Sequence, residues 1–278
     1  MSRIGDVPVV QRKLLGDGDL IILIDRKDRR YLKQLARGHR ITIRGSVLRA
    51  DDLIGHPEGA VVEDRERFVA FRAKPADLAT LMERPAEPIF AKDAGAILAR
   101  TGLGAGDRVV EVGVGAGILT AVLLRAVGPS GSLTSYEIRE DFAHLARENV
   151  KRALGSTPNW RLVVGDAAEC LDVRDADCAV VDVPAPERLV GPLAQSLRPG
   201  GALAVHLPTV PQVQRLRAAL AASGAFAAVE TLELLERPWH VEGASVRPAH
   251  RMVAHTAFLT FARRLAGPDH SAGSDGSV

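Results

Sequence analysis

The chain has 278 residues, a formal net charge of +2 and 46% hydrophobic residues. This length accommodates one large hydrophobic core and a smaller accessory domain. The net charge is close to neutral, so the chain as a whole is not strongly basic. With only two cysteines, Cys170 and Cys178, a disulfide framework is not expected, and no apolar run reaches membrane-spanning length. The N-terminus also lacks the apolar stretch of a signal peptide. We therefore expect a soluble protein of the reducing cytoplasm, without a membrane partner.

Residues 1–75 are predicted to form a small β-rich N-terminal domain. Short β-type runs at 20–24, 41–43 and 60–62 are separated by polar or glycine-containing turns. This spacing favours a small, mostly antiparallel barrel or sheet. A connector follows, in which Asp77–Met82 is predicted to be helical.

Basic side chains are concentrated in this N-terminal domain, where they could meet phosphates. They are Arg26, Lys27, Arg29, Arg30, Lys33, Arg37, Arg40, Arg44 and Arg49. The aspartates that interleave with them are Asp25, Asp28, Asp51 and Asp52. Aromatic residues make up only 4% of the chain, which leaves few platforms for splayed-out bases. A solvated face and a nucleic-acid-binding face both stay open, and the interleaved acids favour the former.

Residues 76–265 alternate between helical and strand-like patterns, which is typical of a layered α/β domain. The predicted helices lie at 92–101, 117–127, 140–153, 187–197 and 210–223, and a strand follows each. The last apolar run, Thr256–Phe261, is predicted to close the sheet as an antiparallel edge strand. Residues 266–278 are small and polar, so we expect a disordered tail.

Within this domain, residues 109–120 read Val-Val-Glu-Val-Gly-Val-Gly-Ala-Gly-Ile-Leu-Thr, a strand that enters a glycine turn and opens a helix. Glu111, Gly113, Gly115 and Gly117 occupy every second position. Glycines lack a Cβ and let a bound nucleoside approach the backbone closely. The last gap is one residue shorter than in the dinucleotide-binding pattern. The turn resembles motif I of S-adenosylmethionine (SAM)-dependent methyltransferases.

Acidic residues follow the next three predicted strands. Glu137 follows the predicted strand 132–136 and can accept hydrogen bonds from the ribose hydroxyls of the cofactor. Asp166 lies just after the strand 160–164 and can accept one from the adenine amine. Asp182 follows the strand 178–181. Because the carboxyl ends of parallel strands share one sheet edge, these carboxylates are expected to meet there. The predicted SAM-binding residues are Glu111, Gly113, Gly115, Gly117, Leu119, Thr120, Glu137, Ile138, Asp166, Ala167 and Asp182.

Further motifs extend the resemblance over nearly the whole chain. They lie at 54–59, 91–93, 124–129, 135–139, 158–160, 230–231, 237–239, 246–250 and 255–259. Together they resemble the tRNA (adenine-N1)-methyltransferase family, which modifies the T-loop adenine. The resemblance implies a class I, Rossmann-like methyltransferase fold, with a seven-stranded sheet whose last strand is antiparallel, after a small N-terminal β domain. It also implies a homo-oligomer, a tetramer or a dimer.

The chain departs from the family pattern on the acceptor side. Phe90 stands where the family has a Tyr that helps to hold the target adenine, and Glu187 stands where a Trp is expected. His206 occupies what resembles the position of a second Tyr, and Glu87 that of a Gln. The cofactor motifs are intact while these positions have changed together. This contrast predicts a retained reaction and an altered substrate.

Asp182 is the predicted contact to the methyl acceptor. By resemblance, it would accept a hydrogen bond from an amine or ring N–H and orient the nucleophile, although it could instead cap the following helix. His206 is a second catalytic candidate, as a base or hydrogen-bond donor, or else a structural histidine. Phe90 could stack on a flat acceptor or pack in the core. With Glu187, these residues are the predicted acceptor pocket.

No metal site is predicted. His240, His250 and His255 lack a cysteine or close carboxylate that would complete a ligand set, and in the family these positions are structural.

Three functional hypotheses are consistent with these sequence features. The preferred one is a SAM-dependent methyltransferase that modifies a small aromatic or nitrogen-heterocyclic metabolite, such as an indole- or purine-like ring. The alternative is a divergent tRNA (adenine-N1)-methyltransferase acting on the T-loop adenine. A third reading, a SAM-binding subunit that holds RNA for a partner, is disfavoured by the presence of Asp182 and the complete cofactor motifs.

Overall fold

The computed structural model describes residues 14–82 and 87–267. Contacts divide the chain into two units, Met1–Glu83 and Arg84–Val278, and each is described by itself. Most of the predicted tail, 266–278, lies outside the described residues. Across the described ranges, no helix has the length and apolar character needed to cross a membrane.

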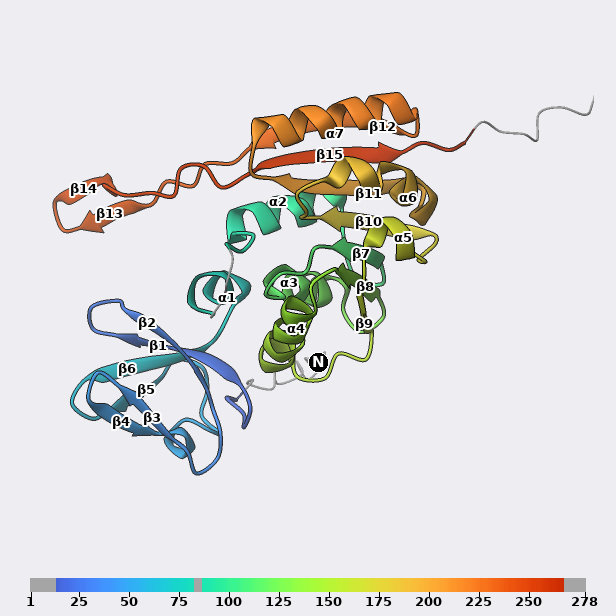
Figure 1. The fold of residues 1–278 in the computed structure, drawn as a ribbon. Helices are drawn as coiled ribbons and strands as arrows, with labels where there is room; N and C mark the ends of the chain where they lie inside the picture. The colour runs from blue at the N-terminus through green and yellow to red at the C-terminus, as the bar shows by residue number, and fades with distance from the viewer. Residues whose placement is uncertain (1–13, 83–86, 268–278) are drawn as a thin grey trace, which may run out of the picture. The chain divides into compact units, whose positions relative to one another are not determined.

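The first unit is built on an antiparallel sheet of four strands in the order β2-β1-β6-β5 (Figure 1). Its elements are β1 (Leu20–Asp25), β2 (Arg30–Gln34), β3 (Arg40–Ile43), β4 (Ser46–Arg49), η1 (Ala50–Asp52), β5 (Ala60–Glu63), β6 (Arg67–Arg72) and α1 (Pro75–Leu81). Strands β3 and β4 form a separate hairpin. The predicted runs correspond to β1, β3 and β5, whereas their partners β2, β4 and β6 carry arginines and were missed.

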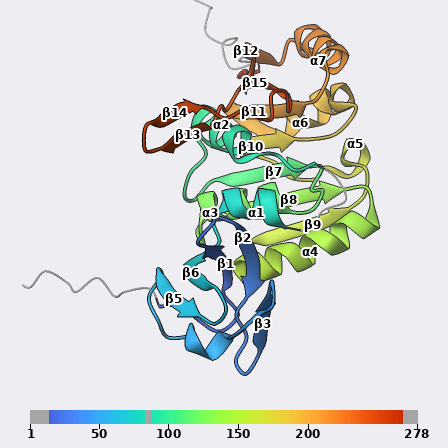
Figure 2. The ribbon, with the colours of Figure 1, turned by 90° about the vertical axis from the view of Figure 1, so that its left-hand side faces the viewer.

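The second unit is a three-layer α/β domain around a sheet in the order β12-β15-β11-β10-β7-β8-β9 (Figures 1 and 2). The strands are β7 (Arg108–Val112), β8 (Ser132–Glu137), β9 (Trp160–Val164), β10 (Ala176–Val181), β11 (Leu197–Leu207), β12 (Phe226–Glu233) and β15 (Phe258–Arg264). The helices are α2 (Ala91–Thr101), α3 (Ile118–Val127), α4 (Glu140–Leu154), α5 (Ala167–Cys170), η2 (Pro186–Leu189), α6 (Val190–Ser196) and α7 (Val210–Ser223).

Each face of this sheet has its own hydrophobic core. One core joins the sheet to α2, α3 and α4, with Ile97, Leu123 and Val150 fully buried. The other joins it to α5, α6 and α7, with Leu193 and Leu216 buried. Because both faces are covered, the central strands are largely apolar on both sides, as is typical of parallel sheets, with Glu111 and Ser135 as buried polar exceptions.

Two predicted elements differ from the structure. Strand β15 is antiparallel as predicted, but it lies between β11 and β12, so β12 is the edge strand. The helix predicted at 187–197 is divided into η2 and α6. Pro192 lacks an amide hydrogen, and its ring would clash with the carbonyl of Arg188 in a continuous helix, so α6 starts only at Val190.

A second hairpin, β13 (Trp239–Glu242) and β14 (Ser245–Pro248), was not predicted. It forms its own two-stranded sheet and extends beyond the strands of the large sheet (Figure 1). Both of its strands are largely exposed.

Candidate active site

The glycine turn joins β7 to α3 at the carboxyl edge of the large sheet. Gly113 has a φ of +87°, and a Cβ there would lie 2.1 Å from the backbone oxygen of Asp182. At Gly117, a Cβ would lie 3.0 Å from the Cα of Ala146 on α4, whereas nothing lies within 4 Å of that position at Gly115. The sequence assigned all three glycines to the approach of a nucleoside. In the structure Gly115 faces open space, while Gly113 and Gly117 are required by packing within the protein.

Glu137 at the end of β8 holds this turn in place. Its Oε2 accepts hydrogen bonds from the backbone amides of Val114 and Gly115, both at 3.1 Å, and its Oε1 accepts one from the amide of Arg139 at 3.0 Å. The residue is only 8% exposed. The carboxylate predicted to bind ribose thus also shapes the loop against which a cofactor would lie.

Glu111 lies fully buried beneath the turn. Thr120 donates to both of its carboxylate oxygens, at 3.0 and 2.9 Å, and Ser135 donates to one at 2.6 Å. Trp160 Nε1 in turn donates to Ser135 Oγ at 3.0 Å. Burial raises the pKa of Glu111 to about 7. Glu111 and Thr120 were predicted to bind the cofactor, but neither is exposed, so the structure gives both a supporting position behind the turn.

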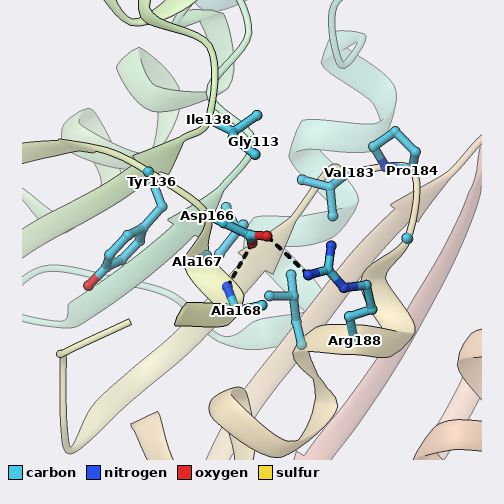
Figure 3. Close-up of a pocket in the computed structure, with 13 residues that line it drawn as sticks. Gly113, Tyr136, Ile138, Asp166, Ala167, Ala168, Val183, Pro184 and Arg188 are labelled. Atoms are coloured by element: carbon cyan, nitrogen blue, oxygen red, sulfur yellow. Dashed lines mark hydrogen bonds and ion pairs between the residues drawn. The ribbon is translucent and has the colours of Figure 1, made fainter. Parts of the chain in front are cut away.

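A cavity of about 270 Å³ opens beside the turn (Figure 3). It lies between the ends of β8 and β9 and the segment that follows β10. Most of its lining is apolar and comes from Val112, Tyr136, Ile138, Ala167, Ala168, Val183, Pro184, Ala185 and Leu189. Ile138, an aliphatic side chain that is 66% exposed, borders this cavity. A flat, weakly polar ring such as adenine fits a lining of this kind.

Asp166 is the acidic group of this cavity, and both of its oxygens have partners (Figure 3). Oδ1 accepts the amide of Ala168 at 2.9 Å, as the N-cap of α5, and Oδ2 accepts Arg188 Nη2 at 3.1 Å. The amide hydrogen bond and the guanidinium lower the pKa of Asp166, so it is an ionised acceptor. Arg188 was not predicted, because only the fold of η2 brings it opposite Asp166, 22 residues earlier in the chain.

A second cavity, of about 490 Å³, continues from the first. The two share lining residues Gly113, Ile138, Val183 and Pro184. The second also reaches Glu87, Gly115, Glu137, Arg139, Phe142, Asp182, Pro208 and Gln212. A small recess of about 40 Å³, lined in part by Leu119, lies against Gly115 and Asp182. An elongated ligand can therefore run from the apolar cavity past the glycine turn to Asp182.

Asp182 and His206 form a pair at the end of this path. The backbone amide of Asp182 donates to Val112 O at 2.8 Å, and its Oδ1 lies 3.1 Å from His206 Nδ1. Helix η2 starts at Pro186 with Ala185 as its N-cap, so the alternative role of Asp182 as a helix cap is wrong.

His206 is 9% exposed, and its Nε2 is buried without a hydrogen-bond partner among the described residues. Because Nδ1 faces a carboxylate, we assign the proton of the neutral ring to Nδ1, which leaves Nε2 as an acceptor. Buried polar atoms in proteins are nearly always paired, so this orphaned nitrogen indicates a place for water or another donor group, although His206 itself lines neither of the two larger cavities.

The other predicted acceptor residues are not brought to these cavities. Phe90 is half-buried as the N-cap residue of α2 and lines neither cavity. Glu187 accepts a hydrogen bond from Arg215 on α7 at 3.0 Å and likewise lines neither. Glu87, which the sequence marked only as a departure from the family, does line the larger cavity.

His255 has a structural position. Its Nε2 lies 2.8 Å from Pro208 O and its Nδ1 lies 2.7 Å from Glu233 Oε1, so it joins the ends of β11 and β12. The Pro208 carbonyl and the Glu233 carboxylate raise the pKa of His255. Within the described ranges, no group of three or more His, Cys, Asp or Glu side chains could hold a metal ion.

Comparison with known proteins identifies the family. Residues 77–246 match the model described as "tRNA methyltransferase complex GCD14 subunit", and residues 14–62 match the model described as "TrmI-like N-terminal". The chain belongs to the GCD14 family of tRNA methyltransferase subunits. The family match and the fold together confirm the predicted SAM-dependent methyltransferase, with its α/β fold, its N-terminal β region and SAM as cofactor.

Several proteins resemble the chain along most of its length. A tRNA (adenine(58)-N(1))-methyltransferase TrmI of Thermus thermophilus is 33% identical over 247 residues, which cover 88% of this chain and 96% of the relative. The crystal structure of tRNA (m1A58) methyltransferase TrmI from Aquifex aeolicus has a TM-score of 0.78 and 28% identity, covering 92% and 100% of the two chains. A SAM-dependent O-methyltransferase from Thermotoga maritima has a TM-score of 0.83 and 29% identity, covering 94% and 98%.

Proposed function

We propose that the protein transfers a methyl group from SAM to N1 of an adenine in the T-loop of tRNA. The observation that carries this proposal is the 33% identity to a tRNA (adenine(58)-N(1))-methyltransferase over 88% of the chain, N-terminal unit included. The preferred sequence-based reading, a small heterocyclic metabolite as acceptor, gains no support from the relatives that cover most of this chain. A tRNA substrate agrees with the cytoplasmic location expected from the sequence.

The acceptor-side departures from the family pattern are weaker evidence for a different substrate than the sequence alone suggested. Phe90 and Glu187 lie outside the two cavities, so their exchange does not by itself redefine the acceptor pocket. Of the four departures from the family pattern, Glu87 lines the larger cavity. His206 does not line it but contacts Asp182, a carboxylate of its wall. Asp182, the carboxylate predicted to orient the acceptor, is present at the cavity wall. These positions support a modified clamp around the same kind of base.

SAM, when bound, supplies an electrophilic methyl carbon attached to a sulfonium. The residues of the chain provide positioning and charge. The apolar cavity would hold the adenine of the cofactor, with Asp166 as acceptor for its amine and Glu137 for its ribose. The open space at Gly115 leaves room for the rest of the cofactor beside Asp182. In-line displacement requires little beyond this alignment.

Asp182 would accept a hydrogen bond from the exocyclic amine of the target adenine and so orient its N1 lone pair. Methylation of N1 makes the ring cationic, and a carboxylate in a partly dehydrated site stabilises that developing charge. His206 donates through Nδ1 to Asp182 and so holds the carboxylate in one orientation. We assign His206 a positioning role, with its Nε2 turned to a water or a hydrogen-bond donor group.

The test is methyl transfer from labelled SAM to an unmodified tRNA transcript, with a transcript whose T-loop adenines are replaced by guanine as control. We expect label only in the first transcript, as 1-methyladenine in nuclease digests. A panel of indole- and purine-like metabolites is run in parallel. Transfer to a metabolite with none to tRNA would overturn the proposal and restore the metabolite reading.

The roles of the pair are tested with Asp182→Asn and His206→Gln. We expect Asp182→Asn to lower kcat by about 100-fold or more, because the charge on the carboxylate is lost. His206→Gln should lower kcat less, by about 10-fold, because it loosens Asp182 without removing it. The Kd for SAM should stay within about twofold in both. If SAM binding collapsed in Asp182→Asn, this residue would serve the cofactor and not the acceptor.

A further inference from the structure

The hairpin of β3 and β4 in the first unit carries an unusual concentration of positive charge. Residues 37–49 read Arg-Gly-His-Arg-Ile-Thr-Ile-Arg-Gly-Ser-Val-Leu-Arg, with four arginines and no acidic residue. One face of the hairpin packs on the core of the unit through Ile41, Ile43 and Leu48. The opposite face is exposed to solvent.

On the exposed face, two arginines stand directly opposite each other. The antiparallel register pairs Arg40 with Arg49, and Thr42 with Val47, and all four residues are exposed. Like charges that face each other across a strand pair destabilise a hairpin. The facing guanidiniums of Arg40 and Arg49 are therefore expected to lower the local stability of this hairpin.

The turn of the hairpin shows a second local conflict. Ile43 pairs with Ser46, so Arg44 and Gly45 form a two-residue turn, with φ of +50° and +84°. Turns with two positive φ values favour Asn-Gly or Asp-Gly, because a residue with a Cβ and a long side chain is strained in this region. A third arginine thus occupies a position where the backbone favours another residue. Arg65 lies nearby, with its Nη1 3.6 Å from where a Cβ of Gly45 would be.

The hairpin arginines also differ from Arg26 and Arg30 of this unit in their partners. Arg26 pairs with Glu63 at 3.1 Å, and Arg30 pairs with Asp77 at 3.2 Å. In the described part of the unit, Arg40, Arg44 and Arg49 have no ion-pair partner.

Two acidic residues bind backbone amides of the segment 37–49. Asp64 accepts the amide of Val47 at 2.9 Å, and Asp51 accepts the amide of Gly38 at 3.1 and 3.2 Å. Asp52 follows in η1 and is exposed. The solvated-face interpretation of the sequence therefore suits the paired arginines, but not the hairpin.

We propose that the exposed face of this hairpin, defined by Arg40, Arg44 and Arg49, binds the phosphodiester backbone of RNA. The inference rests on the proposed function, which makes the RNA a tRNA. Guanidiniums without protein partners bind phosphate by paired, charge-assisted hydrogen bonds, and binding a polyanion relieves the repulsion between Arg40 and Arg49. Neither strand of the hairpin carries an aromatic side chain, so the contact is to the backbone and independent of base sequence.

The experiment compares two double variants of equal charge change in the full-length protein. Arg40→Gln/Arg49→Gln removes two hairpin charges, and Arg26→Gln/Arg30→Gln removes two that are already paired with carboxylates. Kd for a tRNA transcript is measured over a salt series, together with KM for tRNA and Kd for SAM. For the hairpin variant, we expect the slope of log Kd against log salt to fall by about 1 per arginine removed. Its KM for tRNA should rise, with SAM affinity unchanged and a smaller change in the control.

Arg44→Asn separates binding from folding. Asn suits a left-handed turn position better than Arg, so the melting temperature should stay the same or rise while the Kd for tRNA also rises. A loss of affinity in a protein that is at least as stable cannot come from misfolding.

The outcomes distinguish this inference from the proposed function. If the unaltered protein methylates tRNA but the hairpin variants keep its KM, Kd and salt slope, the hairpin is not the RNA contact and the function stands. If the unaltered protein binds no tRNA, both fail. If it binds tRNA with the expected salt slopes but transfers no methyl group, the hairpin assignment stands and the proposed reaction fails.

Discussion

At the scale of single residues, the acidic side chain of the glycine motif acts from behind the site. Glu111 is fully buried, and hydroxyls of Thr120 and Ser135 donate to its oxygens. Taking a carboxylate out of water disfavours its charged form, and the pKa of Glu111 rises to about 7. The folded protein therefore holds a proton on Glu111 at pH values where the unfolded chain has lost it.

This proton makes stability depend on pH. Between the ordinary pKa of 4.5 and about 7, the folded state binds one proton more than the unfolded state, so stability falls as pH rises through this window. The loss is up to about 3 kcal/mol. Glu111→Gln removes the titrating group and should flatten the dependence, measured by urea unfolding at pH 5 and pH 7.5. Glu148→Gln, an exposed change on α4, is the control. An unchanged pH slope in Glu111→Gln would place the proton elsewhere.

At the scale of elements, the turn between β7 and α3 combines two kinds of glycine. Gly113 and Gly117 admit the backbone of Asp182 and the packing of α4, whereas Gly115 borders open space. A motif that is regular in sequence is therefore divided in its physical tasks: packing requires a glycine at positions 113 and 117, although Gly113 also lines the cavities, whereas no protein atom crowds Gly115.

Exchanging these glycines for alanine should separate the tasks. Gly113→Ala adds a Cβ 2.1 Å from a backbone oxygen, at a φ of +87°, and should cost about 3 kcal/mol or more of stability. Gly115→Ala should cost only about 1 kcal/mol, because the site is open, but should weaken SAM binding. Thermal melts and calorimetric titration with SAM measure both effects. Undiminished SAM binding by Gly115→Ala would contradict the assignment of this space to the cofactor.

At the scale of the whole molecule, the hairpin of β13 and β14 exposes several large apolar side chains to solvent. Trp239 is 60% exposed, Val241 70% and Val246 58%. Contiguous exposed apolar side chains of this size mark protein contacts. We propose that this hairpin forms the contact of the homo-oligomer that the family resemblance led us to expect.

Trp239→Ser/Val241→Ser should then lower the mass of the particle in solution, measured by light scattering after size-exclusion chromatography. Val61→Ser/Val210→Ser, two exposed valines outside the hairpin, is the matched control and should leave the mass unchanged. If the unaltered protein has the mass of one chain, or the hairpin variant keeps the mass of the unaltered oligomer, the hairpin is not the contact.

The sequence by itself determined the elements whose requirements are local. Helices α2, α3, α4 and α7 lie within about a residue of their predicted ranges, because apolar periodicity and glycine C-caps act within a few residues. The glycine turn and the strand-end acids were found for the same reason, since a positive φ and the end of an apolar run can be read from neighbouring residues. The resemblance to the methyltransferase family and the identity of the cofactor were inferred from these motifs.

Only the tertiary structure decided which of these residues meet. Asp182 pairs with His206 and Asp166 with Arg188 across more than 20 residues of chain, because parallel strands are joined by crossover helices and neighbours in the sheet are distant in sequence. Burial likewise depends on strand order, which placed Glu111 behind the turn and β12 outside β15. The chemistry of the cofactor could thus be inferred from local patterns, whereas the shape of the acceptor side depended on long-range packing.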